Sequence, residues 1–317
     1  MHVRIEARLP EQDGEASLLR HPLLERIGRT PLVELRRVAS PDGPRVFGKL
    51  ESANPGGSVK DRAARGIVMA AIRAGELPQR RLLDSTSGNT GIAYAMLGAA
   101  LGFRVTLCVP ATASPERLRI LQAYGAEVVA TDPLEGSDGA MHRARALVAG
   151  QPDRYYYADQ YSNPANPAAH EESTGPEILG QLAGLPLDLF VAGLGTSGTF
   201  VGVARFLRRA SPITRLASVE PDAPFHGLEG LKHMASAIVP AIYDPTLADF
   251  QLAVKTEEAH AMTRTLAREE GLFVGPSSGA AVAAALRAGR EMRASTVAVV
   301  LPDDGERYLS DRFWEGA

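Results

Sequence analysis

The sequence predicts an α/β protein made of two doubly wound, three-layer domains. Short apolar runs rich in β-branched residues alternate with segments of helical spacing, and this alternation is typical of parallel sheets covered by helices on both faces. The chain has 317 residues, which is longer than a single hydrophobic core usually supports. Two domains are therefore expected.

The alternation runs through most of the chain. The predicted strands are 46–51, 81–85, 104–110, 126–131, 155–160, 187–194, 215–221 and 296–304. The first predicted helix begins at Lys60. The others lie in the stretches GIAYAMLGAALG, SPERLRILQAYG, GAMHRARALVAG, FVGVARFLRRA and AAVAAALRAGR. A Pro- and Asn-rich stretch, QYSNPANPAAH (160–170), interrupts this pattern and is expected to cross between the domains.

The composition gives no sign of a nucleic-acid or membrane partner. Lys and Arg number 34 against 37 Asp and Glu, a formal net charge of −3, so no basic excess favours polyanions. No apolar stretch is long enough to span a bilayer. Residues 1–27 are expected to form a polar N-terminal extension, because they lack the apolar middle of a signal peptide.

The cysteine and histidine content argues against a metal site. The single cysteine, Cys108, excludes an internal disulfide and a cysteine-rich metal centre, and it fits a reducing cytoplasm. It lies in the apolar run FRVTLCVP, where a small buried residue is expected. The seven histidines show no ligand spacing, so no metal is expected.

Three loops that follow predicted strands share one chemistry. They are STSGNTG (85–91), GLGTSGT (193–199) and GPSSG (275–279). Each combines glycine with hydroxyl side chains at a helix start, which suits a bound anion at the carboxyl ends of strands. Taken singly, each is better explained as a helix N-cap, and the second matches neither the Walker A nor the dinucleotide fingerprint.

A lysine at a helix start adds a second signal. In NPGGSVKDR (54–62), Lys60 follows two glycines and stands at the helix end that least favours positive charge. Lys60 is either an ordinary solvated lysine or one that is shielded from solvent, and in the second case lost solvation and the helix N-terminus both favour the neutral amine. Anion sites beside such a lysine indicate a phosphorylated carbonyl cofactor held as a Schiff base, and pyridoxal 5'-phosphate (PLP) is the commonest one.

Six motifs, in this order, resemble the cysteine synthase family: NPGGSVKDR, TSGNTG, QYSNPAN, GLGTSGT, GPSSGAA and GERYL. These enzymes are O-acetylserine sulfhydrylases of PLP fold type II, a tryptophan synthase β-like fold, and are related to cystathionine β-synthase. The resemblance covers residues 28–309. It implies a cofactor in the cleft between a smaller domain, 51–157, and a larger domain formed by 28–50 and 158–317.

The resemblance also implies a role for each matching residue. Lys60 would hold the cofactor and move the substrate's α-proton, Asn89 would bind the ring hydroxyl, and Ser277 would face the pyridine nitrogen. The phosphate would lie in the loop of Gly195, Thr196, Ser197, Gly198 and Thr199. The substrate carboxylate would contact Thr86, Ser87, Thr90 and Gln160.

The implied reaction is a β-replacement that makes L-cysteine. O-Acetyl-L-serine or O-phospho-L-serine loses its β-substituent through an α-aminoacrylate intermediate, and sulfide or thiosulfate then adds at Cβ. A serine opposite the pyridine nitrogen favours this elimination over transamination, because the ring stays largely unprotonated. Two alternatives use the same scaffold: cystathionine β-synthase-type condensation of serine with homocysteine, and serine/threonine dehydration.

Two positions are left open by the resemblance. Asp303, in LPDDGERYL, stands where many relatives carry a small polar residue; it either approaches the pyridine nitrogen or is a solvated loop carboxylate, and the second is expected. Lys232, in EGLKHM, either meets an anionic second substrate or lies on the surface.

The resemblance implies partners as well as residues. A homodimer acting on small molecules is the family expectation. The NPGGSVKDR motif is closest to the B-type enzymes, so binding of a serine acetyltransferase tail is not favoured.

Overall fold

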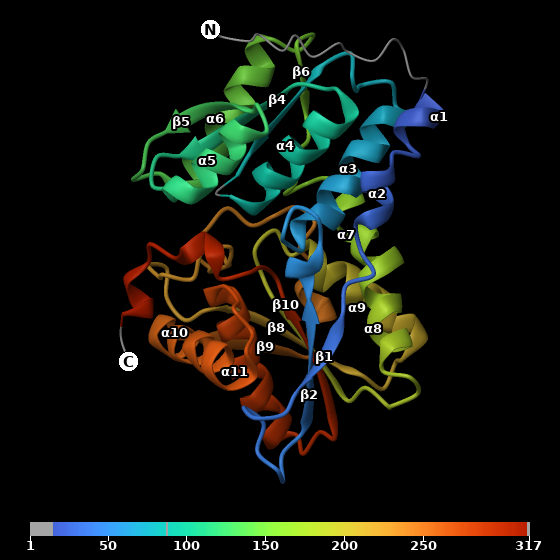
Figure 1. The fold of residues 1–317 in the computed structure, drawn as a ribbon, viewed down its shortest axis with the longest axis vertical. Coiled ribbons are helices and arrows are strands. Elements are labelled where there is room, and N and C mark those ends of the chain that lie inside the picture. The colour runs from blue at the N-terminus through green and yellow to red at the C-terminus, as the bar shows by residue number, and fades with distance from the viewer. Residues whose placement is uncertain (1–14, 87, 316–317) are drawn as a thin grey trace, which may run out of the picture.

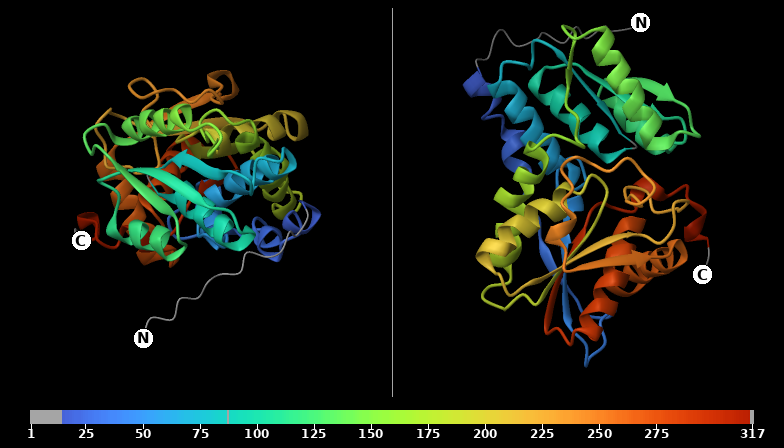
Figure 2. Two further views of the ribbon diagram at one scale, coloured as in Figure 1. Left: turned by 90° about the horizontal axis from the view of Figure 1, so that it is seen from above. Right: turned by 180° about the vertical axis from the view of Figure 1, so that it is seen from behind.

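The computed structural model describes residues 15–86 and 88–315. Over these residues the chain forms two lobes, each with a mainly parallel sheet between layers of helices (Figure 1). The view from behind shows the same two lobes, one above the other (right panel of Figure 2). The predicted fold class is confirmed.

Within the described residues, the strands are β1 (Leu32–Leu35), β2 (Arg45–Leu50), β3 (Arg81–Ser85), β4 (Val105–Pro110), β5 (Glu127–Thr131), β6 (Tyr155–Tyr157), β7 (Leu189–Gly193), β8 (Arg215–Pro221), β9 (Phe250–Val254) and β10 (Thr296–Leu301). The α-helices of the same range are α1 (Glu15–Leu18), α2 (Pro22–Arg26), α3 (Lys60–Arg73), α4 (Asn89–Leu101), α5 (Pro115–Ala123), α6 (Gly136–Gly150), α7 (Ala165–Ala169), α8 (Gly175–Gln181), α9 (Gly198–Ala210), α10 (Thr256–Thr265) and α11 (Pro276–Glu291).

The larger lobe contains a six-stranded sheet in the order β1-β2-β10-β7-β8-β9. Along β10, Val297 and Val299 pack in the layer that contains α11, whereas Ala298 and Val300 pack in the layer that contains α9. Both faces of the strand are therefore buried. This explains why it reads as one continuous apolar run, as expected for a sheet covered on both sides.

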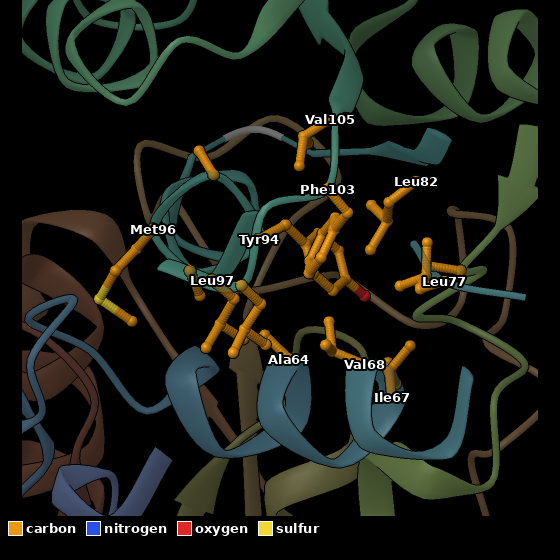
Figure 3. Close-up of a cluster of buried hydrophobic side chains, with 14 of the residues drawn as sticks. Ala64, Ile67, Val68, Leu77, Leu82, Tyr94, Met96, Leu97, Phe103 and Val105 are labelled. Carbon is orange, nitrogen blue, oxygen red and sulfur yellow. The ribbon is translucent and has the colours of Figure 1, made fainter. Parts of the chain in front are cut away.

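The smaller lobe contains a four-stranded parallel sheet in the order β5-β4-β3-β6. Helices α3, α4 and α5 cover one face; Ile67 and Val68 of α3 pack against Tyr94 of α4 in its core (Figure 3). Helix α6 covers the other face, where Cys108 packs with Ala140. Burial raises the pKa of the Cys108 thiol to about 11, which confirms that this cysteine serves as a small buried residue.

The observed elements differ from the predicted ones mainly at the sheet edges. Strands β1 and β9 were not predicted, and β1 runs antiparallel to β2. The stretch 160–170 is only partly a loop, because α7 begins at Ala165 and leads through a π-helical turn into α8. Its prolines stand near helix starts, where the missing N–H of proline does no harm.

The described part of the N-terminal extension packs on its own chain. Leu24 and Ile27 are buried in the core that contains α3 and α4, while residues 1–14 lie outside the described residues. Strands β1 and β2 pair into the larger sheet, and we keep the proposed domain boundaries of 28–50 with 158–317 and of 51–157. No helix among the described residues is long and apolar enough to cross a membrane.

A buried ion cluster joins the two lobes beside the start of α3. Arg62 is 2% exposed and donates to both carboxylate oxygens of Glu51 (2.7 and 2.9 Å) and of Glu177 on α8 (2.8 and 2.7 Å). Lys49 of β2 also donates to Glu177 at 2.7 Å. Burial alone would raise the pKa of Glu177, but Arg62 and Lys49 lower it to about 2. These contacts fix α3, and with it Lys60, against the larger lobe.

Candidate active site

Two adjoining cavities lie where loops of both lobes meet. The inner cavity, about 500 Å³, is lined by the 195–199 loop, Ser277 and Asp303. The outer cavity, about 580 Å³, is lined by Thr86, Thr90, Gln160, Arg117 and Lys232. Lys60, Asn89 and Thr196 line both cavities.

Lys60 is the first residue of α3, and its side chain stands on the wall that the two cavities share. Burial lowers the pKa of its amine, and the charges of Asp303 and Glu51 oppose this only in part. Since a lowered pKa favours the uncharged form, the site favours an amine that can attack a carbonyl. This agrees with the position predicted for it at the helix start.

The glycine turn before Lys60 is closed by Asp61. The backbone N–H of Gly56 donates to the Asp61 carboxylate, and a Cβ at position 56 would collide with that carboxylate. Gly57 has φ of +75°, a conformation that glycine adopts without strain. Burial raises the pKa of Asp61 to about 7. The two glycines are thus required by the turn that delivers Lys60 to the cavities.

The 195–199 loop forms an anion cradle at the N-terminus of α9. A Cβ at Gly195 would collide with the carbonyl oxygen of Gly230, and one at Gly198 would collide with the Asn166 amide. Ser197 adopts φ of +69°, and its buried hydroxyl has no hydrogen-bond partner among the described residues. An orphan hydroxyl and free helix N–H groups suit a phosphate.

His170 supports this cradle from behind without adding charge. Its Nδ1 lies 2.9 Å from Thr174 Oγ1, and its Nε2 lies 3.3 Å from Thr199 Oγ1. Burial lowers the pKa of the imidazole well below its ordinary value. The ring is therefore neutral and holds the Thr199 side chain by a hydrogen bond.

The outer cavity contains a connected set of polar side chains. Thr90 Oγ1 donates to Gln160 Oε1 (2.7 Å), and Gln160 Nε2 donates to the carbonyl oxygen of Ser85 (2.7 Å). Thr86 Oγ1 accepts from the backbone N–H groups of Gly88 (3.0 Å) and Gly91 (3.1 Å). Ser87, the remaining residue predicted here, lies outside the described residues.

Asn166, which the sequence analysis did not single out, connects the two cavities. Its Nδ2 donates to the carbonyl oxygen of Gln160 (2.8 Å) and to Thr196 Oγ1 (3.1 Å). Asn166 therefore links Gln160, a predicted contact of the substrate carboxylate, to Thr196 of the anion cradle. Asn166 lies in the QYSNPAN motif, and this motif is the sequence signal that could have identified it.

Two ion pairs close the mouth of the outer cavity, each with one partner from each lobe. Lys232 Nζ donates to Asp138 Oδ1 of α6 (2.9 Å) and lies 5.0 Å from the centre of the Tyr161 ring. Lys232 is 7% exposed, so the surface alternative was wrong.

The second pair joins Arg117 of α5 to Glu229. The Arg117 guanidinium also stacks over the Tyr308 ring, 4.8 Å from its centre. Arg117 and Glu229 were not predicted, because SPERLR resembles any amphipathic helix start.

Asp303 is a buried member of the inner cavity and not a solvated loop carboxylate. It is 1% exposed, and its Oδ2 accepts from Asn89 Nδ2 (2.6 Å) and from the Tyr308 hydroxyl (2.7 Å). The expectation from the sequence was therefore wrong. Asp303 is buried because the loop after β10 turns inward between the lobes, where α4 and Tyr308 cover it.

The residues present fit PLP. The inner cavity offers an orphan hydroxyl, a helix N-terminus and a glycine cradle for a phosphate, with Ser277 on the same wall. A lysine with a lowered pKa stands beside them for a carbonyl carbon. The predicted residues that the structure describes, from both lobes, thus line one continuous space.

Comparison with known proteins agrees with this arrangement. A family model described as pyridoxal-phosphate dependent enzyme matches residues 23–303. A cysteine synthase of Aquifex aeolicus (strain VF5) is 46% identical over 310 residues, which cover 95% of this chain and 94% of the relative. The crystal structure of cysteine synthase (OASS) from Entamoeba histolytica matches with a TM-score of 0.88 and 38% identity, covering 94% of this chain and 91% of that one.

A further crystal structure, of O-ureido-L-serine synthase, matches with a TM-score of 0.87 and 41% identity, covering 93% of this chain and 95% of that one. These matches extend over nearly the whole sequence and over the fold. The chain therefore belongs to the family of pyridoxal-phosphate-dependent enzymes, and within that family to the cysteine synthases.

Proposed function

We propose that the protein is a PLP-dependent cysteine synthase that makes L-cysteine by β-replacement. The substrate is an activated serine, O-acetyl-L-serine or O-phospho-L-serine. The second substrate is sulfide, which gives L-cysteine directly, or thiosulfate, which gives S-sulfocysteine that a separate thiol reductant must convert to L-cysteine. One observation carries this proposal: Lys60 stands between an anion cradle and a pocket of carboxylate-binding side chains. The similarity to cysteine synthases supports it over the condensation with homocysteine and over dehydration.

In the inner cavity, the chain's own residues hold and orient the cofactor. Thr196, Ser197, Thr199 and the adjoining glycines would hold its phosphate, Ser277 would face its pyridine nitrogen, and Asn89 would donate to its ring hydroxyl. PLP, when bound, withdraws electrons from an attached amino acid and thereby makes the α-proton acidic. Lys60 attaches the cofactor and afterwards carries that proton on its amine.

In the outer cavity, the residues position the substrate. Thr86, Ser87, Thr90 and Gln160 would bind its α-carboxylate. Of these, Thr86, Thr90 and Gln160 line the outer cavity near the start of α4 and offer hydroxyl and amide groups there. The backbone N–H of Gln160 donates to Asp84 at 3.2 Å, and burial raises the pKa of that carboxyl to about 7. The inter-lobe ion pairs at the mouth limit the entry of water, which would compete with sulfur as the nucleophile.

We also propose that the protein is a cytoplasmic homodimer. A homodimer in the cytoplasm is consistent with the family and with a single, buried cysteine. Small amino acids and sulfur donors are the partners, and a serine acetyltransferase tail is not proposed as one.

The test is a substrate panel on the PLP-loaded protein. O-Acetylserine, O-phosphoserine and serine are each combined with sulfide, thiosulfate and homocysteine, and the product is identified as cysteine, S-sulfocysteine or cystathionine. Fast formation of cysteine from an activated serine and a sulfur donor is expected. Preferential formation of cystathionine from serine, or of pyruvate and ammonia without use of sulfur, would contradict the proposal.

Lys232 is expected to select for anionic sulfur donors. Replacement of Lys232 by glutamine should lower kcat/KM for thiosulfate by about tenfold or more, the size of one charge-assisted hydrogen bond, because its ammonium lies at the cavity mouth. The value for sulfide should change by less than about threefold, since sulfide is smaller and bears less charge to pair. Steady-state kinetics with both donors measures the ratio.

Lys255→Gln is the matched control, because Lys255 is exposed and lies outside both cavities. It should leave both values unchanged. Equal losses for sulfide and thiosulfate in Lys232→Gln would mean that Lys232 serves only to hold the lobes together through Asp138.

A further inference from the structure

The Asp303 carboxylate is fixed from two sides by the fold. Its backbone pairs with Ser58, next to the turn that delivers Lys60. Its Oδ1 lies against Gly275, where a Cβ would collide with it. Gly275 is the N-cap of α11, and a helix N-terminus favours negative charge. The carboxylate is therefore held in place, buried and beside the inner cavity.

The contacts of Asp303 point to Asn89. Oδ2 accepts from Asn89 Nδ2 at 2.6 Å and from the Tyr308 hydroxyl at 2.7 Å, whereas the buried Oδ1 has no hydrogen-bond partner among the described residues. Tyr308 is itself buried and covered by the Arg117 guanidinium. Of these contacts, only the one with Asn89 leads to a side chain that lines both cavities.

The Asn89 amide is held at both ends. Its oxygen accepts from the Arg307 guanidinium, and its nitrogen donates to Asp303. Arg307 also donates to the carbonyl oxygen of Gly56, so it is anchored in its turn. Because a cation faces the oxygen and an anion faces the nitrogen, the amide cannot exchange the two ends. One N–H of Nδ2 is used by Asp303, and the other remains available.

We propose that Asp303 is a positioning residue of the active site, which fixes the Asn89 amide so that its second N–H is presented to the cofactor's ring hydroxyl. The inference rests on the proposed function, in which Asn89 contacts the cofactor. Asp303 touches neither reacting atom; it acts through Asn89. A merely structural carboxylate would brace Tyr308 and the loop after β10, and would leave cofactor binding unchanged once the protein is folded.

The test measures PLP binding and needs no substrate. Apo-protein is titrated with PLP to obtain the equilibrium Kd, and the circular dichroism of the bound cofactor's visible band reports its orientation. Asp303→Ala is expected to weaken PLP binding by about tenfold, the size of one hydrogen bond to a charged group, and to change the visible band. Asp303→Asn keeps an acceptor oxygen for Asn89 and should restore both values to near wild type.

Asp304→Ala is the matched control. This neighbouring, half-buried carboxylate lines neither cavity and bonds to the backbone N–H of Glu306 instead. It should bind PLP like the wild type. Tyr308→Phe removes the other donor to Asp303 and should also leave the Kd within about threefold, because the Asn89 contact remains.

A double-mutant cycle decides whether Asp303 acts through Asn89. In an Asn89→Ala background, Asp303→Ala should have no further effect on the Kd, because residues that share one interaction are not additive. Additive losses, an unchanged visible band in Asp303→Ala, or equal losses in the Ala and Asn variants would each overturn the inference. Thermal unfolding of every apo variant shows that it is folded at the temperature of the titration.

This outcome is separate from that of the substrate panel. Failure of cysteine formation with intact PLP binding would refute the proposed function and leave the Kd and band comparisons interpretable. Normal turnover with an unaltered Asp303→Ala band would refute only the positioning role.

Discussion

Lys60→Ala is expected to lower the rate of cysteine formation by about 10³-fold or more. The variant removes both the amine that attaches the cofactor and the group that moves the α-proton, and general acid–base catalysis alone contributes about 10²- to 10⁴-fold. Since Nζ makes no hydrogen bond or ion pair with the residues that the structure describes, the fold should be retained. Turnover and thermal unfolding are measured together.

Borohydride treatment gives a second readout for the same residue. Reduction of the PLP-loaded wild type should attach the cofactor covalently to the peptide that contains Lys60, as seen by mass spectrometry, and Lys60→Ala should not be labelled there. Lys60→Arg tests whether the positive charge of the side chain is enough. Arginine keeps a cation but forms no imine, so this variant should be as inactive as the alanine variant. Label on another lysine, or substantial turnover by either variant, would refute the assignment.

The depressed pKa of Lys60 explains why its position matters as much as its identity. At the start of α3 the helix dipole and the loss of water both disfavour the ammonium form. The contact that holds Lys60 in this position lies outside the cavities. Arg62, two residues later in α3, donates to Glu177 on the larger lobe. The catalytic role proposed for Lys60 therefore depends on an ion cluster whose members line neither cavity.

The central strands could be predicted from the sequence because they are buried on both faces. β10 reads TVAVVL without a polar interruption after its first residue, and this signal does not depend on any partner. β9 alternates between exposed and buried positions over five residues, and β1 has four residues at the other edge of the sheet. Such short edge strands are defined by their neighbours, which a local pattern does not contain.

The site residues also divide into those set by a local sequence pattern and those set by distant neighbours. Lys60, the 195–199 loop and Ser277 could be located because glycine, hydroxyl and lysine residues stand close together in the sequence. The contact between Asn89 and Asp303 joins residues 214 positions apart, and that between Lys232 and Asp138 joins residues 94 apart. Whether such a charged side chain is solvated or buried depends on how two lobes meet. That is why the expectation for Asp303 failed.

Arg62→Met is expected to destabilise the protein by about 3–5 kcal/mol at neutral pH, because it leaves the buried carboxylate of Glu51 and the partly buried one of Glu177 without their main cation. Lys49 still pairs with Glu177, but Glu51 keeps only neutral donors, Thr30 and Asn54. Urea unfolding of the apo-protein measures the change. Arg80→Met is the control: its ion pair with Glu76 is about one-third exposed, so a change below about 1 kcal/mol is expected.

The pH dependence of this loss tests its electrostatic origin. In the wild type the pKa of Glu177 is lowered from 4.5 to about 2, so the stability that this gives is present above pH 4.5 and is lost as the pH falls toward 2. In Arg62→Met the carboxyl groups protonate more readily, so the difference between the two proteins should narrow as the pH falls below 4.5. Adding Glu51→Gln to Arg62→Met should recover part of the stability at pH 7, because the charge left unpaired at Glu51 is then removed, whereas Glu177 still pairs with Lys49. A difference that is independent of pH, or no recovery in the double variant, would mean that the loss comes from packing around the Arg62 side chain rather than from its charge.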